Sequence, residues 1–143
     1  MTEEQVTKEI LRWLDVHGWD VVSFDFPQSG TGQVLRPTTP GGDGIGAIIP
    51  DIVAAKEKQI AYFENKDRVV SSDFEKVSAV KQSRAYDEAF SQMLGRELGN
   101  SLTVGIGFPE SDDCESRALP YMHLVDFVVV VGRNGLRFLK GGL

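Results

Sequence analysis

Residues 124–131, LVDFVVVV, place the strongest constraint on the fold of this chain, because their apolar character is almost unbroken. A strand with one solvated face alternates apolar and polar residues, whereas a near-continuous apolar run is typical of a central strand covered on both faces. Residues 101–108, SLTVGIGF, indicate a second buried strand. We therefore expect an α/β fold with a mixed central sheet flanked by helices.

The N-terminal segment predicts a helix over residues 3–17. Thr2 and Gln5 have the spacing of a capping box, and Gly18 ends the pattern. The apolar residues recur at helical spacing, namely Val6, Ile10, Trp13 and Leu14. Residues 19–26, WDVVSFDF, follow as a strand, because they alternate in part and are rich in β-forming residues.

Two short β-prone runs, residues 48–55 and 59–66, surround the polar sequence KEKQ and predict a hairpin. A long helix is expected next, because Ser72 and Glu75 have capping-box spacing and a thin apolar pattern continues to about residue 95. The predicted order is helix, three strands, helix and strand.

The C-terminal part adds a loop and a hairpin to this order. Residues 109–123 lack periodicity and are expected to form a loop before the last apolar run. The turn RNG then leads into LRFLK, residues 136–140, a short edge strand. An extra C-terminal β-hairpin is therefore predicted.

Composition limits the domain count and the partners of the chain. Its 143 residues are 41% hydrophobic, which fits a single domain over residues 1–143. Cys114 is the only cysteine, so an internal disulfide and a cysteine zinc cluster are excluded. No apolar run reaches the ~18 residues of a membrane helix, so we expect no membrane partner and a cytoplasmic location.

The charge of the chain bears on nucleic-acid binding. A net charge of −6 argues against a protein that coats nucleic acid through bulk electrostatics, so any DNA contact must be local. Basic residues do cluster in mid-chain, where they permit a positive patch on an acidic body. They are Lys56, Lys58, Lys66, Arg68, Lys76, Lys81 and Arg84.

The Gly- and Pro-rich residues 27–46 break all periodicity. A connection of this length is either a functional loop or a disordered connector. Its glycines are not followed by Gly-Lys-Ser or Gly-Lys-Thr, so a phosphate-binding loop and a nucleotide cofactor are not expected.

Acidic residues interrupt the predicted hairpin at positions where a strand interior should be apolar. The hairpin places Asp51 opposite residues in the mid-sixties of the second strand, and so beside Glu64. Because side chains alternate along a strand, Glu64 and Lys66 lie on the same face. Two carboxylates this close repel unless a cation lies between them, and oxygen ligands suit Mg²⁺ or Mn²⁺. A metal ion with a neighbouring lysine can activate water and stabilise charge on a phosphoryl group. The pattern predicts a phosphodiesterase site.

Pro50-Asp51 followed by Glu64-Asn65-Lys66 resembles the signature of the PD-(D/E)xK nuclease superfamily. The core of that family runs helix, three strands, helix, strand, and the order predicted for residues 3–108 is similar. The resemblance implies the restriction-endonuclease-like fold, with an αβββαβ core.

The resemblance also implies roles for particular residues. Asp51 and Glu64 are expected to bind the metal together with the main-chain carbonyl of Asn65, and Lys66 is expected to serve the attacking water. Many members add a glutamate from the first helix, for which Glu9 is our candidate. A solvated helix glutamate is the simpler interpretation of Glu9, and Glu3, Glu4 and Asp15 are further candidates for the same role.

Gln82 and Tyr86 resemble a glutamine and a tyrosine that RecB-like members of the superfamily place beside the active site. Their spacing would put both on one face of the expected long helix. A polar surface pair with Tyr86 partly packed explains them equally well. We predict a structural role for His17 and treat His123 as a weak candidate for a catalytic base. Asp126 is expected to be a buried polar residue or an interface residue.

The sequence thus predicts a Mg²⁺- or Mn²⁺-dependent endonuclease that acts on DNA, expected to work as a homodimer. A restriction or defence enzyme and a junction-resolving enzyme both fit, although the acidic composition counts against a four-way junction as substrate. The alternative is a non-catalytic binding module with a nuclease-like fold.

Overall fold

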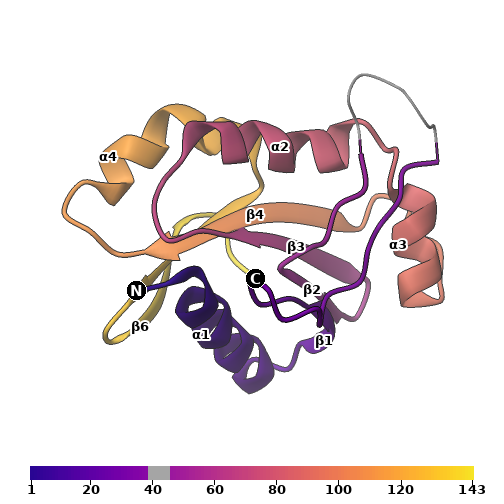
Figure 1. Cartoon of the computed structure of the whole chain (residues 1–143), viewed down its shortest axis with the longest axis horizontal. Coiled ribbons are helices and arrows are strands. Elements are labelled where there is room, and N and C mark those ends of the chain that lie inside the picture. Colours follow the sequence, from indigo (N-terminus) through magenta and orange to yellow (C-terminus); the bar gives the residue numbers. More distant parts are fainter. Residues whose placement is uncertain (39–45) are drawn as a thin grey trace.

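A computed structural model describes residues 1–38 and 46–143 of the chain. A six-stranded mixed sheet lies between helices (Figure 1), which confirms the expected α/β class. The helices and strands are α1 (Glu3–Val16), β1 (Asp20–Phe24), β2 (Ile52–Lys56), β3 (Gln59–Asn65), α2 (Ser71–Gln82), α3 (Asp87–Leu94), β4 (Leu102–Pro109), α4 (Cys114–Ala118), the 3₁₀ helix η1 (Leu119–Leu124), β5 (Phe127–Gly132) and β6 (Gly135–Lys140).

The strands lie in chain order, β1 to β6, across the sheet. The β3–β4 and β4–β5 pairs are parallel, and the others are antiparallel. Ile52 pairs with Phe63 in the β2–β3 hairpin, as the sequence predicted. The apolar strand β5 lies second from the edge rather than at the centre, but its valines are buried on both faces.

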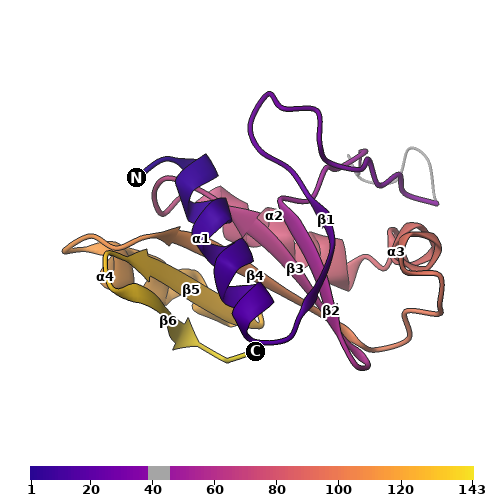
Figure 2. The ribbon, with the colours of Figure 1, turned by 90° about the horizontal axis from the view of Figure 1, so that it is seen from below.

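The two faces of the sheet carry separate hydrophobic cores. Helix α1 covers one face, where Val6, Ile10 and Leu14 pack against Ile52 and Phe63. Helix α2 covers the other face, where its apolar residues pack with the alternate residues of β3 and β4. Figure 2 shows α1 crossing its face of the sheet, with the β6 edge on one side and β1 on the other. Within the described residues, no helix combines the length and apolar character that crossing a membrane requires.

The predicted long helix over residues 72–95 is wrong, because the chain breaks it into α2 and α3. Arg84 adopts φ 57°, which no continuous α-helix allows. Its side chain pairs with Asp87 and donates to the carbonyl of Gly99, while Phe90 turns into the core. The Ser72 capping box is also wrong: α2 begins at Ser71 after Val70, without a side-chain cap. The capping box of Thr2 and Gln5 on α1 is confirmed.

The expected loop over residues 109–123 contains α4 and most of η1. Ala118 and Met122 are buried in the core on the α2 side of the sheet. Asp126 follows η1 and accepts hydrogen bonds from the Lys81 ammonium (2.9 and 3.1 Å) and the Val104 amide (2.9 Å). It therefore joins α2 to β4 and is a structural polar residue at the start of β5.

Only part of the Gly- and Pro-rich segment 27–46 can be described, because residues 39–45 lie outside the described residues. Leu35 is buried and forms an isolated antiparallel bridge with Ile48. Thr38 donates its amide to the carbonyl of Ala85 (2.9 Å). This part of the segment is thus ordered against the body of the domain.

Candidate active site

Strand alternation determines which side chains of β3 face α2. Ile60 and Tyr62 belong to the core on the α2 side, whereas Ala61 and Phe63 belong to the core on the α1 side. Glu64 continues the first set and therefore faces α2 at the carboxyl end of β3.

Asp51 directly precedes β2 and lies on the same side as Glu64. Its Oδ2 accepts a hydrogen bond from the Asn65 amide (2.7 Å), which fixes the carboxylate against the end of β3. The charges of Asp51 and Glu64 act on each other in this partly buried place. The hairpin register that the sequence predicted thus brings the two acids together.

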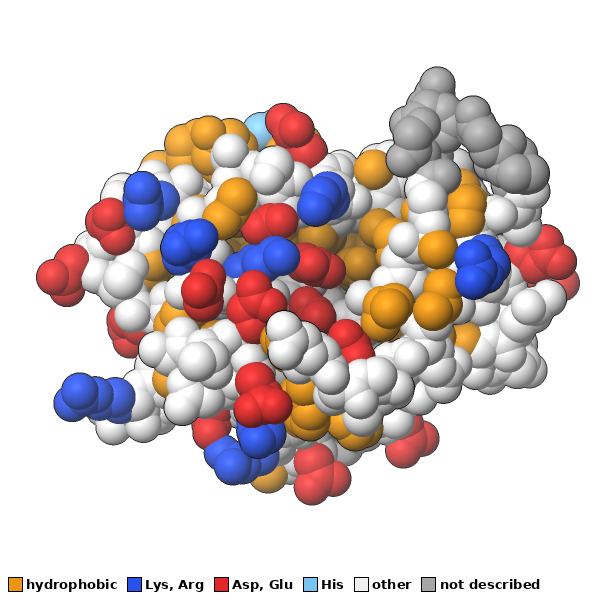
Figure 3. All heavy atoms as spheres, in the orientation of Figure 1, with side chains coloured by type: hydrophobic (Ala, Val, Ile, Leu, Met, Phe, Trp, Pro, Cys, Tyr) orange, Lys and Arg blue, Asp and Glu red, His pale blue; other side chains and the backbone are white. Residues whose placement is uncertain are grey.

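Lys66 lies at the centre of a cluster of carboxylates drawn from three elements. Its Nζ is 3.6 Å from Glu64 Oε1, 3.9 Å from Asp73 Oδ1 and 4.0 Å from Glu3 Oε1. Figure 3 shows acidic side chains gathered around basic ones in the middle of this face, between α1 and α2. The sequence predicted the partnership with Glu64 but not that with Asp73.

Both flanking helices begin at this site. Glu3 lies in the first turn of α1, and Asp73 lies in the first turn of α2. The amino end of a helix carries a partial positive charge that stabilises acidic side chains and favours bound anions. The site therefore combines carboxylates with backbone dipoles that favour negatively charged groups.

Burial and neighbouring negative charges raise the pKa of both Asp51 and Glu64. Burial, reinforced by the charge of Glu64, raises the pKa of Asp51 to about 8, against a smaller opposing effect of the Asn65 amide. Burial also raises the pKa of Glu64, although Lys66 favours its charged form. In the absence of a compensating cation, this pair tends to retain protons.

The carboxylates have the opposite effect on the lysine. Burial alone would lower the pKa of Lys66, but Asp73, Glu64 and Glu3 outweigh it, so the pKa of Lys66 is raised. Lys66 is therefore a protonated hydrogen-bond donor at neutral pH in this arrangement.

The side chain of Asn65 points to the other face of the sheet and joins β3 to α1. Its Nδ2 donates to the buried Thr7 hydroxyl (3.0 Å). A Cβ at Gly107 on β4 would come within 2.6 Å of Asn65 Oδ1 and 2.7 Å of Ile10 Cδ1. Gly107 thus permits close packing of α1 on β3 and β4.

The helix glutamate at the site is Glu3, so our choice of Glu9 needs correction. Glu9 forms an ion pair with Arg12 on the exposed surface of α1. Val6 and Ile10, three and seven residues after Glu3, are buried, and this spacing places Glu3 on the face that packs against the sheet. That spacing was visible in the sequence. Elsewhere on α1, Glu4 pairs with Lys8 at 3.6 Å, and the side chain of Asp15 is exposed.

Gln82 and Tyr86 do not share a helix face, contrary to expectation, because α2 ends at Gln82 and Tyr86 precedes α3. Gln82 is exposed and lines a pocket of about 270 Å³ with Lys81 and Arg84. Tyr86 is buried and lines a different pocket, which contains Glu64. Only Tyr86 therefore approaches the carboxylates.

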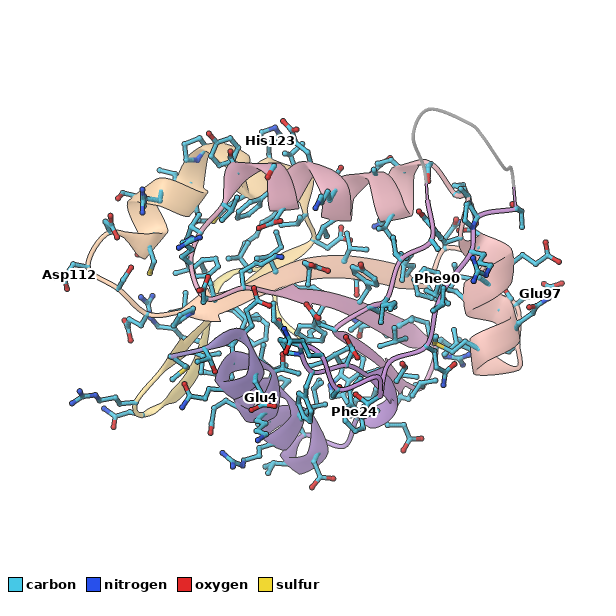
Figure 4. All side chains as sticks on the ribbon, viewed as in Figure 1. Glu4, Phe24, Phe90, Glu97, Asp112 and His123 are labelled. Carbon is cyan, nitrogen blue, oxygen red and sulfur yellow. The ribbon has the colours of Figure 1, made fainter. Side chains whose placement is uncertain are left out.

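The two histidines lie outside the carboxylate cluster. The Nδ1–H of His17 donates a hydrogen bond to the Trp13 carbonyl (2.7 Å), and the imidazole ring stacks on the Trp13 ring. His123 is exposed on η1, above α2 and away from the sheet (Figure 4). Glu4, on α1 at the opposite side of the sheet in the same view, is likewise a surface residue.

The oxygen atoms of this carboxylate cluster are ligands that suit a hard divalent cation. The cluster offers carboxylate oxygens, and Oδ2 of Asp73 is buried with no hydrogen-bond partner among the residues that the structure describes. Within residues 1–38 and 46–143, no three acidic, His or Cys side chains are arranged as a ready metal-binding group. Mg²⁺ commonly uses only one or two carboxylates and keeps several waters. A pair such as Asp51 and Glu64 is therefore sufficient for it.

No family model matches the chain, and neither a curated protein nor a solved structure is significantly similar to it.

Proposed function

We propose that this protein is a Mg²⁺- or Mn²⁺-dependent endonuclease that hydrolyses phosphodiester bonds in DNA. The observation that carries the proposal is the position of Asp51, Glu64 and Lys66. Two partly buried carboxylates of raised pKa and a protonated lysine lie together near the amino ends of two helices.

The fold supports an assignment to the PD-(D/E)xK superfamily. Elements α1, β1, β2, β3, α2 and β4 run in the order of an αβββαβ core, with β3 and β4 parallel. The Asp-containing segment leads into the second strand, and Glu64 and Asn65 end the third, with Lys66 directly after it. The hairpin of β5 and β6 extends the sheet beyond that core.

Asp51, Glu64 and the main-chain carbonyl of Asn65 would hold the metal ion. When bound, Mg²⁺ polarises a phosphoryl oxygen and lowers the pKa of its bound water. Both carboxylates must ionise to become ligands, and the charge of the ion would offset the burial and the repulsion from Glu64 that raise the pKa of Asp51.

Lys66 would orient the attacking water and stabilise negative charge on the phosphoryl oxygens. Its raised pKa makes it a donor, and Glu64, Asp73 and Glu3 hold its ammonium in place. The positive ends of α1 and α2 would attract the same phosphate. A homodimer would allow both strands to be cut, and restriction and junction-resolving activities remain the two variants of the proposal.

Cleavage of supercoiled plasmid and of a four-way junction in Mg²⁺ or Mn²⁺ tests the proposal. We expect the wild type to cut, and Asp51→Asn, Glu64→Gln and Lys66→Gln each to lower the rate at least ~100-fold, as loss of a main electrostatic contribution does. Glu4→Gln is the control, because Glu4 is an exposed acid on the helix that carries Glu3. Equal rates in all variants would refute the assignment of the site. No cleavage of any substrate by folded wild type would favour the non-catalytic binding module.

A further inference from the structure

A pocket of about 510 Å³ opens directly beside Glu64, between β3, α2 and the segment that leads into β2. Its volume lies within the range of pockets that hold small organic groups. In Figure 3 the acidic side chains in the middle of the face give way on the right to hydrophobic side chains. Its apolar and aromatic lining residues include Ile48, Ile49, Tyr62, Val77, Val80 and Tyr86.

The two tyrosines that line the pocket, Tyr62 and Tyr86, are held in position by neighbouring residues. Tyr62 is buried and lies edge-on to Phe90, with 6.1 Å between the ring centroids. The Tyr86 hydroxyl donates a hydrogen bond to the Gly46 carbonyl, also at the pocket wall. Ile49, by contrast, is 47% exposed at the rim and is free to contact a ligand. The pocket is therefore preformed, with one apolar side chain at its opening.

The charged groups at the pocket differ in sign and position. Glu64 belongs to the carboxylate cluster, and Lys76 projects from the exposed side of α2. The positive charge of Lys76 acts on Glu64 and favours its ionised form. The pocket thus combines a wall of apolar and aromatic side chains with a cation, next to the site proposed to cut a phosphodiester.

A nucleotide has matching chemistry, because it joins a flat base, whose faces stack on apolar and aromatic side chains, to an anionic phosphate. A base can enter such a pocket only when it is unstacked, which is costly in a continuous duplex and cheap in a single strand or at a branch. We propose that this pocket receives one unpaired nucleobase of the cleaved strand while Lys76 binds an adjoining phosphate. The substrate class is then nucleic acid with unpaired nucleotides at the cut, an inference that rests on the proposed nuclease function.

Fluorescence anisotropy in EDTA, which separates binding from metal-dependent cleavage, tests this inference with three probes. They are a labelled oligothymidylate, an abasic oligomer of the same length and charge, and the blunt duplex of the oligothymidylate with its complement. We expect the wild type to bind oligothymidylate at least ~10-fold more tightly than either other probe, because one stacked base contributes about 1–3 kcal/mol.

Matched variants identify the pocket as the origin of that preference. Ile49→Ser should remove most of the preference for oligothymidylate over the abasic oligomer, whereas Leu119→Ser, at another exposed apolar residue, should retain it. Lys76→Gln should weaken binding of both single-stranded probes alike, and Lys58→Gln, in the β2–β3 turn, should not.

Equal affinity for the three probes, no binding of oligothymidylate, or a preference that survives Ile49→Ser would overturn the inference. Its failure is distinguishable from failure of the nuclease proposal. If the protein cleaves plasmid but shows no preference for the probe with bases, only the assignment of the pocket is wrong. If the folded protein shows that preference but cleaves no substrate, only the proposed nuclease activity is wrong.

Discussion

At the residue scale, the strongest prediction about stability concerns the carboxyl group of Asp51. The pKa of its carboxyl is about 8 in the folded protein and 3.8 ordinarily, so the folded state holds a proton that the unfolded state releases. From about pH 4 to about pH 8 the unfolded state therefore binds fewer protons, and the free energy of unfolding falls as the pH rises. Thermal melting in EDTA across this range should show the decline.

Asp51→Asn is the matched variant for this prediction. The amide oxygen can still accept the Asn65 N–H but carries no charge at any pH. The variant should melt at a higher temperature than wild type near pH 8 and should show a shallower dependence on pH. An unchanged pH dependence would mean that Asp51 is not the group that holds the proton.

At the scale of elements, the packing of α1 on the sheet depends on a missing side chain. A Cβ at Gly107 would collide with both Asn65 Oδ1 and Ile10 Cδ1. Gly107→Ala should therefore lower the free energy of unfolding by about 1–3 kcal/mol, the usual cost of overpacking. Urea denaturation measures it, with Gly142→Ala as control because a Cβ there meets no neighbour within 4 Å. Equal denaturation midpoints for Gly107→Ala and wild type would contradict this account of the interface.

At the scale of the whole molecule, three elements contribute to one cluster of charge. Glu64 and Lys66 come from β3 and the residue after it, Asp73 from α2, and Glu3 from α1. Such a cluster can exist only in the folded chain, so a cation that binds it stabilises the folded state by mass action.

Thermal melting with and without Mg²⁺ or Mn²⁺ tests that linkage independently of cleavage. The wild type should gain about 2.7 kcal/mol at a metal concentration 100 times the Kd, and less at lower concentrations. Asp51→Asn and Glu64→Gln should lose most of the gain, and Glu4→Gln should retain it. A gain of the same size in all four proteins would place the metal elsewhere.

Local patterns were sufficient where a property depends on neighbours in the chain. The period of two in β3 determined that Glu64 faces the opposite side from Asn65, and the β2–β3 register predicted Asp51 beside Glu64. The helical period and the capping box likewise determined α1. These features follow from backbone geometry that a few adjacent residues specify.

Only the tertiary structure decided which distant groups meet. Asp73 reaches Lys66 because α2 packs over β3 and β4, and Glu3 reaches it because α1 packs on the other face with its amino end near the end of β3. The break at Arg84 depends on contacts with Gly99 and on burial of Phe90, which no local period contains. Periodicity determines the face that a side chain occupies, whereas long-range packing determines its partner across elements.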